Sequence, residues 1–220
     1  MTAVELQPGS VFGSLTALPP GRHALSRAEV AASQRGRLMA AAVAVISVRG
    51  FAAMTITEVV RTARVSPNGF YAQFASLEAC LMEAYDTYVA ALVASITTAL
   101  DAADTPDERI AAAIGGYLAA LDGDRQAARA FLIEFDAVGA AARIKRREGV
   151  ATFAALLAQE HAAMREREPA LGALPATAYV AVSNGIRVQA CDALETTSAP
   201  LSGLAPDIVR WVTALVRGAS

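Results

Sequence analysis

Apolar residues recur at intervals of three and four positions along most of this chain, the spacing that gives an α-helix one buried face. Clusters of β-branched residues flanked by hairpin turn signals are scarce. Alanine dominates the apolar residues and favours helix. We therefore expect an all-α fold. The predicted helices cover residues 26–49, 55–63, 66–74, 76–103, 105–121, 125–138, 140–167, 176–194 and 206–217.

The stretch from Thr55 to Phe74 predicts two short helices joined by a tight turn. Thr55 is a preferred N-cap residue, and Glu58 stands at the spacing of a capping box. Ser66 can cap the second helix, with Pro67 at its first position, where a missing N–H costs nothing. Two short helices with so short a connection form a helix-turn-helix unit, although an ordinary capped helical corner has the same pattern.

One side of this predicted unit is apolar, and it would pack the two helices together. Its members are Ile56, Val59, Val60, Ala63, Val65, Phe70 and Phe74. The opposite side offers short or flat polar groups, which suit phosphates and base edges. Its members are Pro67, Asn68, Tyr71 and Gln73.

A chain of 220 residues can form one small and one larger domain with ample apolar material for a core. Cys80 and Cys191 are too few for a disulfide framework, and their helical surroundings predict reduced core residues. Residues 1–20 lack the basic start and apolar run of a secretory signal. The longest uncharged runs, 87–100 and 169–186, are short or interrupted, so we expect no membrane span and a cytoplasmic location.

The net charge of −2 conceals an uneven distribution. Residues 1–75 contain seven Arg and three Glu, a net charge of +4, and the remainder carries twelve basic and eighteen acidic side chains, a net charge of −6. A basic front and an acidic back suit a protein that presents only its front to nucleic acid. Arg27, Arg35 and Arg37 make the first helix basic, and Arg22 could lie in an arm that reaches a groove of DNA.

The order of these signals resembles the DNA-binding domain of the tetracycline-repressor (TetR) family of transcriptional regulators. A helix ending in RGF precedes the Thr-capped helix, VSPNGFYAQF follows it, and SLEACL opens a long helix. The likeness extends over residues 18–86. The positions that match the family pattern are Thr55, Val65, Ser66, Phe70, Tyr71 and Phe74.

The resemblance implies contacts with double-stranded DNA. Arg64 stands where the family usually has Gly at the turn, and a left-handed conformation there would cost roughly 1 kcal/mol, so the turn is expected to differ slightly. Gly69 stands where a hydroxyl residue is usual, and Leu77 where a Lys often meets a phosphate. The candidate DNA-binding residues are Thr55, Arg64, Ser66, Pro67, Asn68, Gly69, Tyr71, Gln73 and Arg22.

The resemblance further implies a flexible extension over residues 1–25, a helix-turn-helix domain over 26–75, and a helical domain over 76–220 that binds a small-molecule effector. Aromatic residues at helical spacing could line the effector cavity, although such stripes are more often core. Glu134, inside the apolar run AFLIEFDAV, must bind a cationic ligand or pair with an Arg such as Arg143. The candidate ligand residues are Tyr85, Tyr88, Tyr117, Phe131, Glu134 and Phe135.

The last two predicted helices carry apolar stripes, which in the family pair with their copies in a homodimer. Burial of these stripes within one chain is the alternative. A two-fold dimer would bind two half-sites about 34 Å apart in a palindromic operator. The candidate interface residues are Tyr179, Val182, Ile186, Ile208, Trp211, Val212 and Leu215.

The sequence does not indicate an enzyme, and we expect neither a cofactor nor a metal. His23 and His161 have no metal-ligand partner at helical spacing, and no phosphate-binding, nucleophile-elbow or CxxC motif occurs. The basic run Lys145–Arg147 and the helix around His161 would be solvated surface. The resulting prediction is a ligand-responsive repressor that an effector releases from its operator. The alternative is a helical interaction or ligand-binding protein without a specific DNA target.

Overall fold

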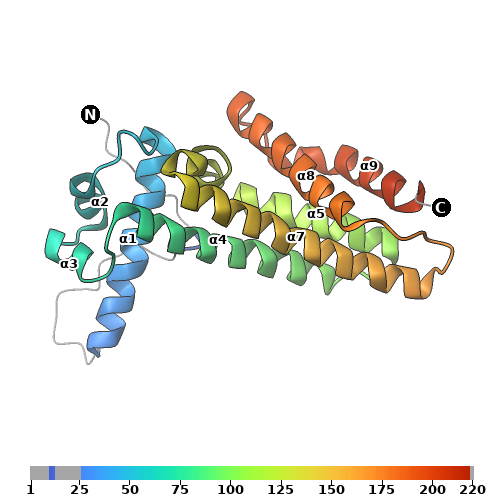
Figure 1. Cartoon of the computed structure of the whole chain (residues 1–220), viewed down its shortest axis with the longest axis horizontal. Helices are drawn as coiled ribbons and strands as arrows, with labels where there is room; N and C mark the ends of the chain where they lie inside the picture. Colours follow the sequence, from blue (N-terminus) through green and yellow to red (C-terminus); the bar gives the residue numbers. More distant parts are fainter. Residues whose placement is uncertain (1–9, 13–25, 219–220) are drawn as a thin grey trace. The chain divides into compact units, whose positions relative to one another are not determined.

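The computed structural model describes residues 10–12 and 26–218, and every regular element within these ranges is helical. The predicted all-α fold is confirmed, and Figure 1 shows its helices in chain order. The α-helices are α1 (Arg27–Arg49), α2 (Ile56–Ala63), α3 (Pro67–Tyr71), α4 (Leu77–Leu100), α5 (Pro106–Gly123), α6 (Arg125–Arg129), α7 (Ala140–Arg167), α8 (Ala176–Thr196) and α9 (Ala205–Gly218). Three short helical segments of other types are also present: the π turn η1 (Ala130–Glu134) and the 3-10 turns η2 (Phe135–Val138) and η3 (Leu201–Leu204).

The described residues form two compact units. Unit 1 comprises those up to Tyr88 together with Gly123–Ala142, and unit 2 comprises Val89–Asp122 together with those from Arg143 onward. This division falls within α4, whereas the functional boundary predicted at residue 76 stays a prediction. The predicted extension over residues 1–25 lies outside the described residues, apart from residues 10–12.

Unit 1 is built on α1, which packs against α2, α6 and η1. A capping box closes the start of α1: Ser26 Oγ accepts from the Glu29 N–H at 3.2 Å, and the Glu29 carboxylate accepts from the Ser26 N–H at 2.7 Å. Gly50 ends the helix with φ at 69°, a conformation that disfavours a side chain. The inner face of α1 buries Leu38, Ala42, Val45 and Ile46.

Helix α4 is long and apolar enough to cross a membrane by length and composition, a test that core helices of soluble proteins also pass. It ends at Leu100 instead of the predicted Ala103. One face of α4 is buried at helical spacing, as a core helix requires. The buried stripe agrees with the sequence and consists of Leu81, Tyr85, Tyr88, Leu92 and Ile96.

The segment from Arg125 to Val138 is not the single helix that its pattern predicts. Helix α6 lasts five residues, and the π turn η1 and the 3-10 turn η2 follow it. Three consecutive residues of this segment, Ala130 to Leu132, are buried, and so is Phe135 after them.

Unit 2 contains α5 up to Asp122, α8, η3 and α9, together with residues 89–100 of α4 and residues 143–167 of α7. The predicted start of α5 is confirmed, because Thr105 Oγ1 accepts from the Glu108 N–H at 3.3 Å and Glu108 accepts from the Thr105 N–H at 2.9 Å. Gly116 allows a close approach between α5 and α4. A Cβ at this position would lie 2.9 Å from Ala99 Cβ and 3.1 Å from the Ser95 carbonyl oxygen.

Turn η3 was not anticipated from the sequence. The Asp122 carboxylate holds its start by accepting from the backbone N–H groups of Leu201 at 2.9 Å and Ser202 at 3.0 Å. Turn η3 packs against both α8 and α9. A carboxylate 79 residues earlier in the chain thus does the work of an N-cap residue, which no local pattern can signal.

Two side chains that the sequence assigns to solvated surface are buried instead. Arg146 is 8 % exposed, although Lys145–Arg147 is a basic run, and His161 is 3 % exposed within a charge-rich part of α7. Neighbouring residues of a helix point about 100° apart, so one member of a charged run can face the core while the next faces solvent. Arg147 accordingly remains exposed.

Candidate functional site

Helices α2 and α3 form the predicted helix-turn-helix, and hydroxyl groups cap both of them. Thr55 Oγ1 accepts from the Glu58 N–H at 3.2 Å, and Ser66 Oγ accepts from the Gly69 N–H at 3.0 Å. The capping box expected at Thr55 is incomplete. The Glu58 carboxylate pairs with Arg49 at 3.5 Å and does not reach back to the cap backbone.

The turn between the two helices keeps a left-handed residue. Arg64 has φ at 53° and ψ at 47°, so the slight change of turn expected from the missing glycine is not found. Arg64 therefore carries the cost of roughly 1 kcal/mol that a left-handed conformation imposes on a non-Gly residue. The Arg64 side chain is exposed, and its positive charge therefore lies on the surface beside the start of α3.

The core between α2 and α3 consists of the predicted apolar residues. The Phe70 and Phe74 rings are buried, with their centroids 5.9 Å apart. Gly69 faces Val65, and a Cβ at position 69 would lie 2.6 Å from Val65 Cγ1. Packing against Val65 gives a structural reason for glycine at position 69. The other buried members of this core are Val59, Val60 and Ala63.

The opposite side of the helix-turn-helix is exposed. Tyr71 leaves 59 % of its surface accessible, although its ring lies edge-on to Phe70 with the centroids 5.6 Å apart. Gly69 and Gln73 are half-buried, and Arg22 lies outside the described residues. The exposed candidates for DNA contact are Thr55, Arg64, Ser66, Pro67, Asn68 and Tyr71.

The groups on this side define its chemistry. Hydroxyl and guanidinium groups bind phosphate oxygens, and a side-chain amide can pair with adenine through two hydrogen bonds. Because the caps of α2 and α3 are satisfied within the chain, the helices that carry these groups are held in place before any ligand arrives.

Two arginines of α1 contact the helix-turn-helix itself. Arg37 Nη1 donates to the Ala63 carbonyl at 3.1 Å, and Arg35 Nη1 donates to the Gln73 carbonyl at 2.7 Å. The sequence analysis counted both only as basic charge. No local pattern signals these contacts, because the partners stand 26 and 38 residues away along the chain.

Four of the six candidate ligand residues meet in unit 1. Tyr85 stacks on Phe135 with centroids 4.5 Å apart, and Phe131 lies 5.5 Å from Tyr85 and 5.0 Å from Tyr88. Phe12 adds a fifth ring, 6.3 Å from Phe131. All five rings are buried against protein, so a ligand at this place would have to separate them. Their role in ligand binding stays a prediction.

The other two candidate ligand residues have different surroundings. Tyr117 belongs to unit 2, where its ring lies 5.8 Å from that of Phe153. Glu134 is half-buried at the end of η1, and a Cβ added to Gly50 would lie 3.3 Å from Glu134 Oε2. The alternative pairing of Glu134 with Arg143 stays a prediction, because Arg143 belongs to unit 2.

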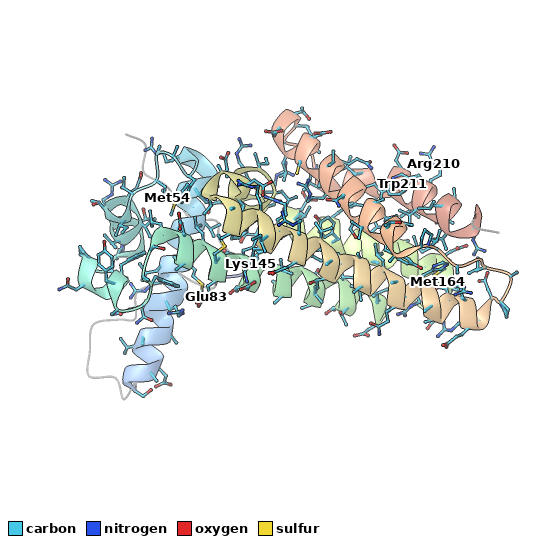
Figure 2. The ribbon with its side chains drawn as sticks, viewed as in Figure 1. Met54, Glu83, Lys145, Met164, Arg210 and Trp211 are labelled. Atoms are coloured by element: carbon cyan, nitrogen blue, oxygen red, sulfur yellow. The ribbon has the colours of Figure 1, made fainter. Side chains whose placement is uncertain are left out.

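Most of the candidate dimer residues are already packed within the single chain, as the alternative interpretation of their stripes expects. Those at most 8 % exposed are Val182, Ile186, Ile208 and Val212. Trp211 of α9, labelled in Figure 2, is half-buried, and a Cβ on Gly185 of α8 would lie 3.7 Å from its ring. The large apolar side chains that α8 and α9 leave exposed are Val180, Val188 and Leu215.

Tyr179, the remaining dimer candidate, is engaged inside unit 2. Its hydroxyl oxygen lies 2.8 Å from Nδ1 of the buried His161. Burial lowers the pKa of His161 below its ordinary value of 6.5, and the positive charge of Arg165 acts in the same direction. The imidazole is therefore neutral at pH 7.

The thiols of Cys80 and Cys191 are both free. Burial raises the pKa of the Cys80 thiol to about 12. Burial also raises the pKa of Cys191, which is half-buried. Among the described residues, no group of three or more His, Cys, Asp or Glu side chains could hold a metal ion.

Comparison with known families concerns the N-terminal part of the chain. Residues 38–84 match the family model of the bacterial regulatory proteins of the tetR family. This match spans the second half of α1, the helix-turn-helix and the start of α4. No curated protein matches the sequence.

Among solved structures, the chain is similar to the fatty acid degradation regulator FadR from Bacillus halodurans, with a TM-score of 0.76 and 17 % identity over 84 % of this chain and 96 % of that one. FadR from Bacillus subtilis in complex with stearoyl-CoA gives a TM-score of 0.72 and 18 % identity over 83 % and 97 % of the two chains. A putative transcriptional regulator from Pseudomonas aeruginosa PAO1 gives 0.69 and 18 % over 89 % and 94 %. At these identities the likeness concerns the fold.

Proposed function

The chain belongs to the TetR family of bacterial transcriptional regulators, and we propose that it is a homodimeric repressor that a small-molecule effector releases from a palindromic operator. The observation that carries the DNA-binding part is the outward side of α3. Ser66, Asn68 and Tyr71 stand exposed on a short helix whose cap and core are complete without DNA. A cytoplasmic location follows from this role.

The exposed residues divide by the part of DNA that they suit. Hydroxyl groups of Thr55 and Tyr71 suit phosphates, which position a protein without reading sequence. Asn68 suits a base edge, where a bidentate pair with adenine provides about 1–3 kcal/mol of discrimination. Pro67 and Gln73 complete the proposed base-reading surface, and Ser66 the proposed phosphate contacts.

Selection of duplexes from a random-sequence pool by the full-length chain tests this proposal. We expect an enriched palindrome whose half-sites are about 34 Å apart. Tyr71→Phe should weaken binding to every duplex to a similar extent, whereas Asn68→Ala should relax the preference at one base position. Gln159→Ala, which removes an exposed amide from α7, is the matched control and should change neither. A pool without enrichment would contradict the proposal.

We propose that the effector carries an apolar chain and binds at the aromatic cluster of unit 1. The Bacillus subtilis regulator was solved with stearoyl-CoA, and the aromatic rings of this cluster suit an acyl chain. Because the rings pack against one another, an acyl chain must separate them. The bound state would therefore differ in conformation, which is what an effector needs in order to shift an equilibrium.

The proposed route from effector to DNA is α4. Its residues 77–88 belong to unit 1 with the helix-turn-helix, and its residues 89–100 belong to unit 2. A shift of α4 would change the separation of the two recognition helices in the dimer. Tight binding alone would release nothing, because the effector must favour the state that does not fit the operator.

Thermal unfolding and duplex release in the presence of stearoyl-CoA test the effector class, with coenzyme A lacking an acyl chain as control. At a free ligand concentration 100-fold above Kd, we expect stabilisation by about 2.7 kcal/mol. Stearoyl-CoA should also release the selected duplex. If it does neither, acyl thioesters are not the effector class, while the DNA-binding proposal stands.

We propose that the dimer forms through the exposed apolar side chains of α8 and α9, with the half-buried Trp211 beside them. Val188→Glu or Leu215→Glu should convert a dimer to a monomer in sedimentation equilibrium, because each places a charge in an apolar contact. Val48→Glu, at an exposed valine of α1, is the matched control and should leave the dimer intact. A wild-type chain that sediments as a monomer would rule out the interface.

A further inference from the structure

The recognition helix α3 has five residues, so its direction depends on what holds its ends. A helix of this length has no cooperative stability of its own. The last carbonyl groups of a helix lack partners within the helix and carry the negative end of its dipole. In this chain, arginines of α1 supply donors at the ends of both α2 and α3.

Arg35 uses every nitrogen of its guanidinium group. Nη1 donates to the backbone carbonyl of Gln73, two residues after α3, at 2.7 Å. Nε and Nη2 bind the two carboxylate oxygens of Glu83, which Figure 2 labels on α4. The guanidinium carbon lies 4.3 Å from the centroid of the Phe74 ring. One side chain therefore joins α1, the exit of the recognition helix and α4.

Arg37 likewise donates to backbone carbonyl groups, at the end of α2. Its Nη1 donates to the Ala63 carbonyl at 3.1 Å and to the Arg64 carbonyl at 3.4 Å. Ala63 is the last residue of α2, and Arg64 is the left-handed residue of the turn. The helix-turn-helix is thus held from α1 at the carbonyl that ends α2 and at a carbonyl two residues beyond α3.

These contacts fix the positions of α2 and α3 more than they stabilise the fold. The Arg35 and Glu83 side chains are 36 % and 38 % exposed, and ion pairs at such exposure stabilise a fold little because water screens them. A two-pronged arginine–carboxylate pair nevertheless fixes the orientation of both groups, which a lysine cannot do. In this arrangement all three nitrogens of Arg35 donate to partners within the protein.

We propose that Arg35 and Arg37 are positioning residues for DNA binding: they brace the two helices of the helix-turn-helix against α1, and through Glu83 Arg35 also ties the recognition helix to α4. The brace rests on the proposed DNA-binding function. The positive charge of these two arginines alone suggests that they contact DNA. The brace instead gives them a role inside the protein.

Glu83→Gln distinguishes the brace from a direct phosphate contact. If Arg35 binds phosphate, removal of its carboxylate partner frees a positive charge and strengthens binding to every duplex. If Arg35 braces α3, the loss of the two-pronged pair loosens the recognition helix and weakens binding to the operator selectively. Glu78→Gln, at an exposed carboxylate in the first turn of the same helix, measures the effect of the charge alone.

The experiment compares the full-length wild type with Glu83→Gln, Arg35→Lys and Arg37→Lys. For each protein, the affinity is measured for the duplex enriched by the wild type and for a random duplex of equal length, over a range of salt concentrations. We expect the operator-to-random affinity ratio to fall by about tenfold, the order of one lost base pair contact. The salt dependence should stay unchanged in the lysine variants, because lysine keeps the positive charge. Glu78→Gln should leave the ratio unchanged.

An unchanged ratio in both Arg35→Lys and Glu83→Gln, with the wild type still preferring its operator, would overturn the brace and leave the proposed function intact. A purely structural role would lower the unfolding temperature and reduce binding to both duplexes equally, which again leaves the ratio unchanged. Stronger binding of Glu83→Gln to both duplexes would instead identify a phosphate contact of Arg35 and overturn the brace. A wild type that prefers no duplex would overturn the proposed function itself.

Discussion

His161 Nδ1 lies 2.8 Å from the hydroxyl oxygen of Tyr179, and this contact joins α7 to α8 inside unit 2. His161 Nε2 is buried, and no described residue offers it a hydrogen-bond partner. A charged imidazole would lose its hydration in these surroundings without gaining a compensating anion. The pair therefore requires a neutral histidine.

We expect the chain to lose stability as the pH falls below about 6.5. Burial lowers the pKa of His161 in the folded state, so the unfolded chain binds the proton more readily and acid favours unfolding. The contribution is complete above the unfolded pKa and is lost as the pH falls toward the folded pKa. Urea unfolding of the wild type and of His161→Gln, compared between about pH 7.5 and about pH 5.5, measures it. The same pH dependence in both proteins would contradict the assignment.

The adjacent glycines of α5 should respond to alanine in opposite directions. A Cβ on Gly115 meets nothing within 4 Å, so Gly115→Ala should stabilise the helix by roughly 0.5–1 kcal/mol. A Cβ on Gly116 would lie 2.9 Å from Ala99 Cβ, so Gly116→Ala should destabilise the protein by roughly 1–3 kcal/mol. Free energies of unfolding in urea provide the comparison, with each variant serving as the other's control. Equal effects would show that α5 does not approach α4 at this point.

Arg64 combines a strained backbone with a surface charge, and substitutions can separate the two. Arg64→Gly should stabilise the fold by up to about 1 kcal/mol, because glycine adopts φ at 53° freely. The same change should reduce the salt dependence of duplex binding by about one, as the loss of one phosphate contact does. Arg64→Lys keeps both the strain and the charge and should alter neither quantity. A gain in stability without any change in the salt slope would remove Arg64 from the DNA-binding surface.

Phe12 is a described residue of the N-terminal segment that is buried against unit 1. Its ring lies against Phe131, and the neighbouring Val11 N–H donates to the Asp124 carboxylate at 3.3 Å. Phe12→Ala should lower the free energy of unfolding by about 1.5–3 kcal/mol, the range for burying a large apolar side chain. Val11→Ala, at an exposed position, should change it by less than about 0.5 kcal/mol. Equal, small effects would mean that this segment is not docked in solution.

The helix-turn-helix was predictable because its signals are local. The hydroxyl caps at Thr55 and Ser66 act on backbone groups three residues away, and the Phe70 and Phe74 pair is one helical turn apart. A single stretch of sequence therefore contains every partner. The same reasoning explains why the start of α5, with its cap, proline and glutamate, was placed correctly.

Features that depend on distant partners were not predictable in the same way. The bond from Arg35 to Glu83 spans 48 positions, and the bonds from Asp122 to η3 span about 80. The burial of Arg146 and His161 depends on which neighbour covers each side of α7, whereas their local sequences are polar. The π turn η1 interrupts a segment whose apolar periodicity suggests an ordinary helix. The residues that contact an effector fall in the same class, because a helical aromatic stripe serves core and ligand equally well.

The buried thiol of Cys80 gives this protein a chemical reporter of its own motion. With a pKa of about 12, roughly one Cys80 thiol in ten thousand is ionised at pH 8, and the side chain is fully shielded. A thiol-specific reagent can therefore modify Cys80 only in molecules whose first turns of α4 have moved away from their neighbours. In a Cys191→Ala variant, which leaves Cys80 as the one thiol, the labelling rate measures how often that opening occurs. The same labelling rate, measured with operator duplex or with effector added, would show whether each ligand changes how often the start of α4 opens.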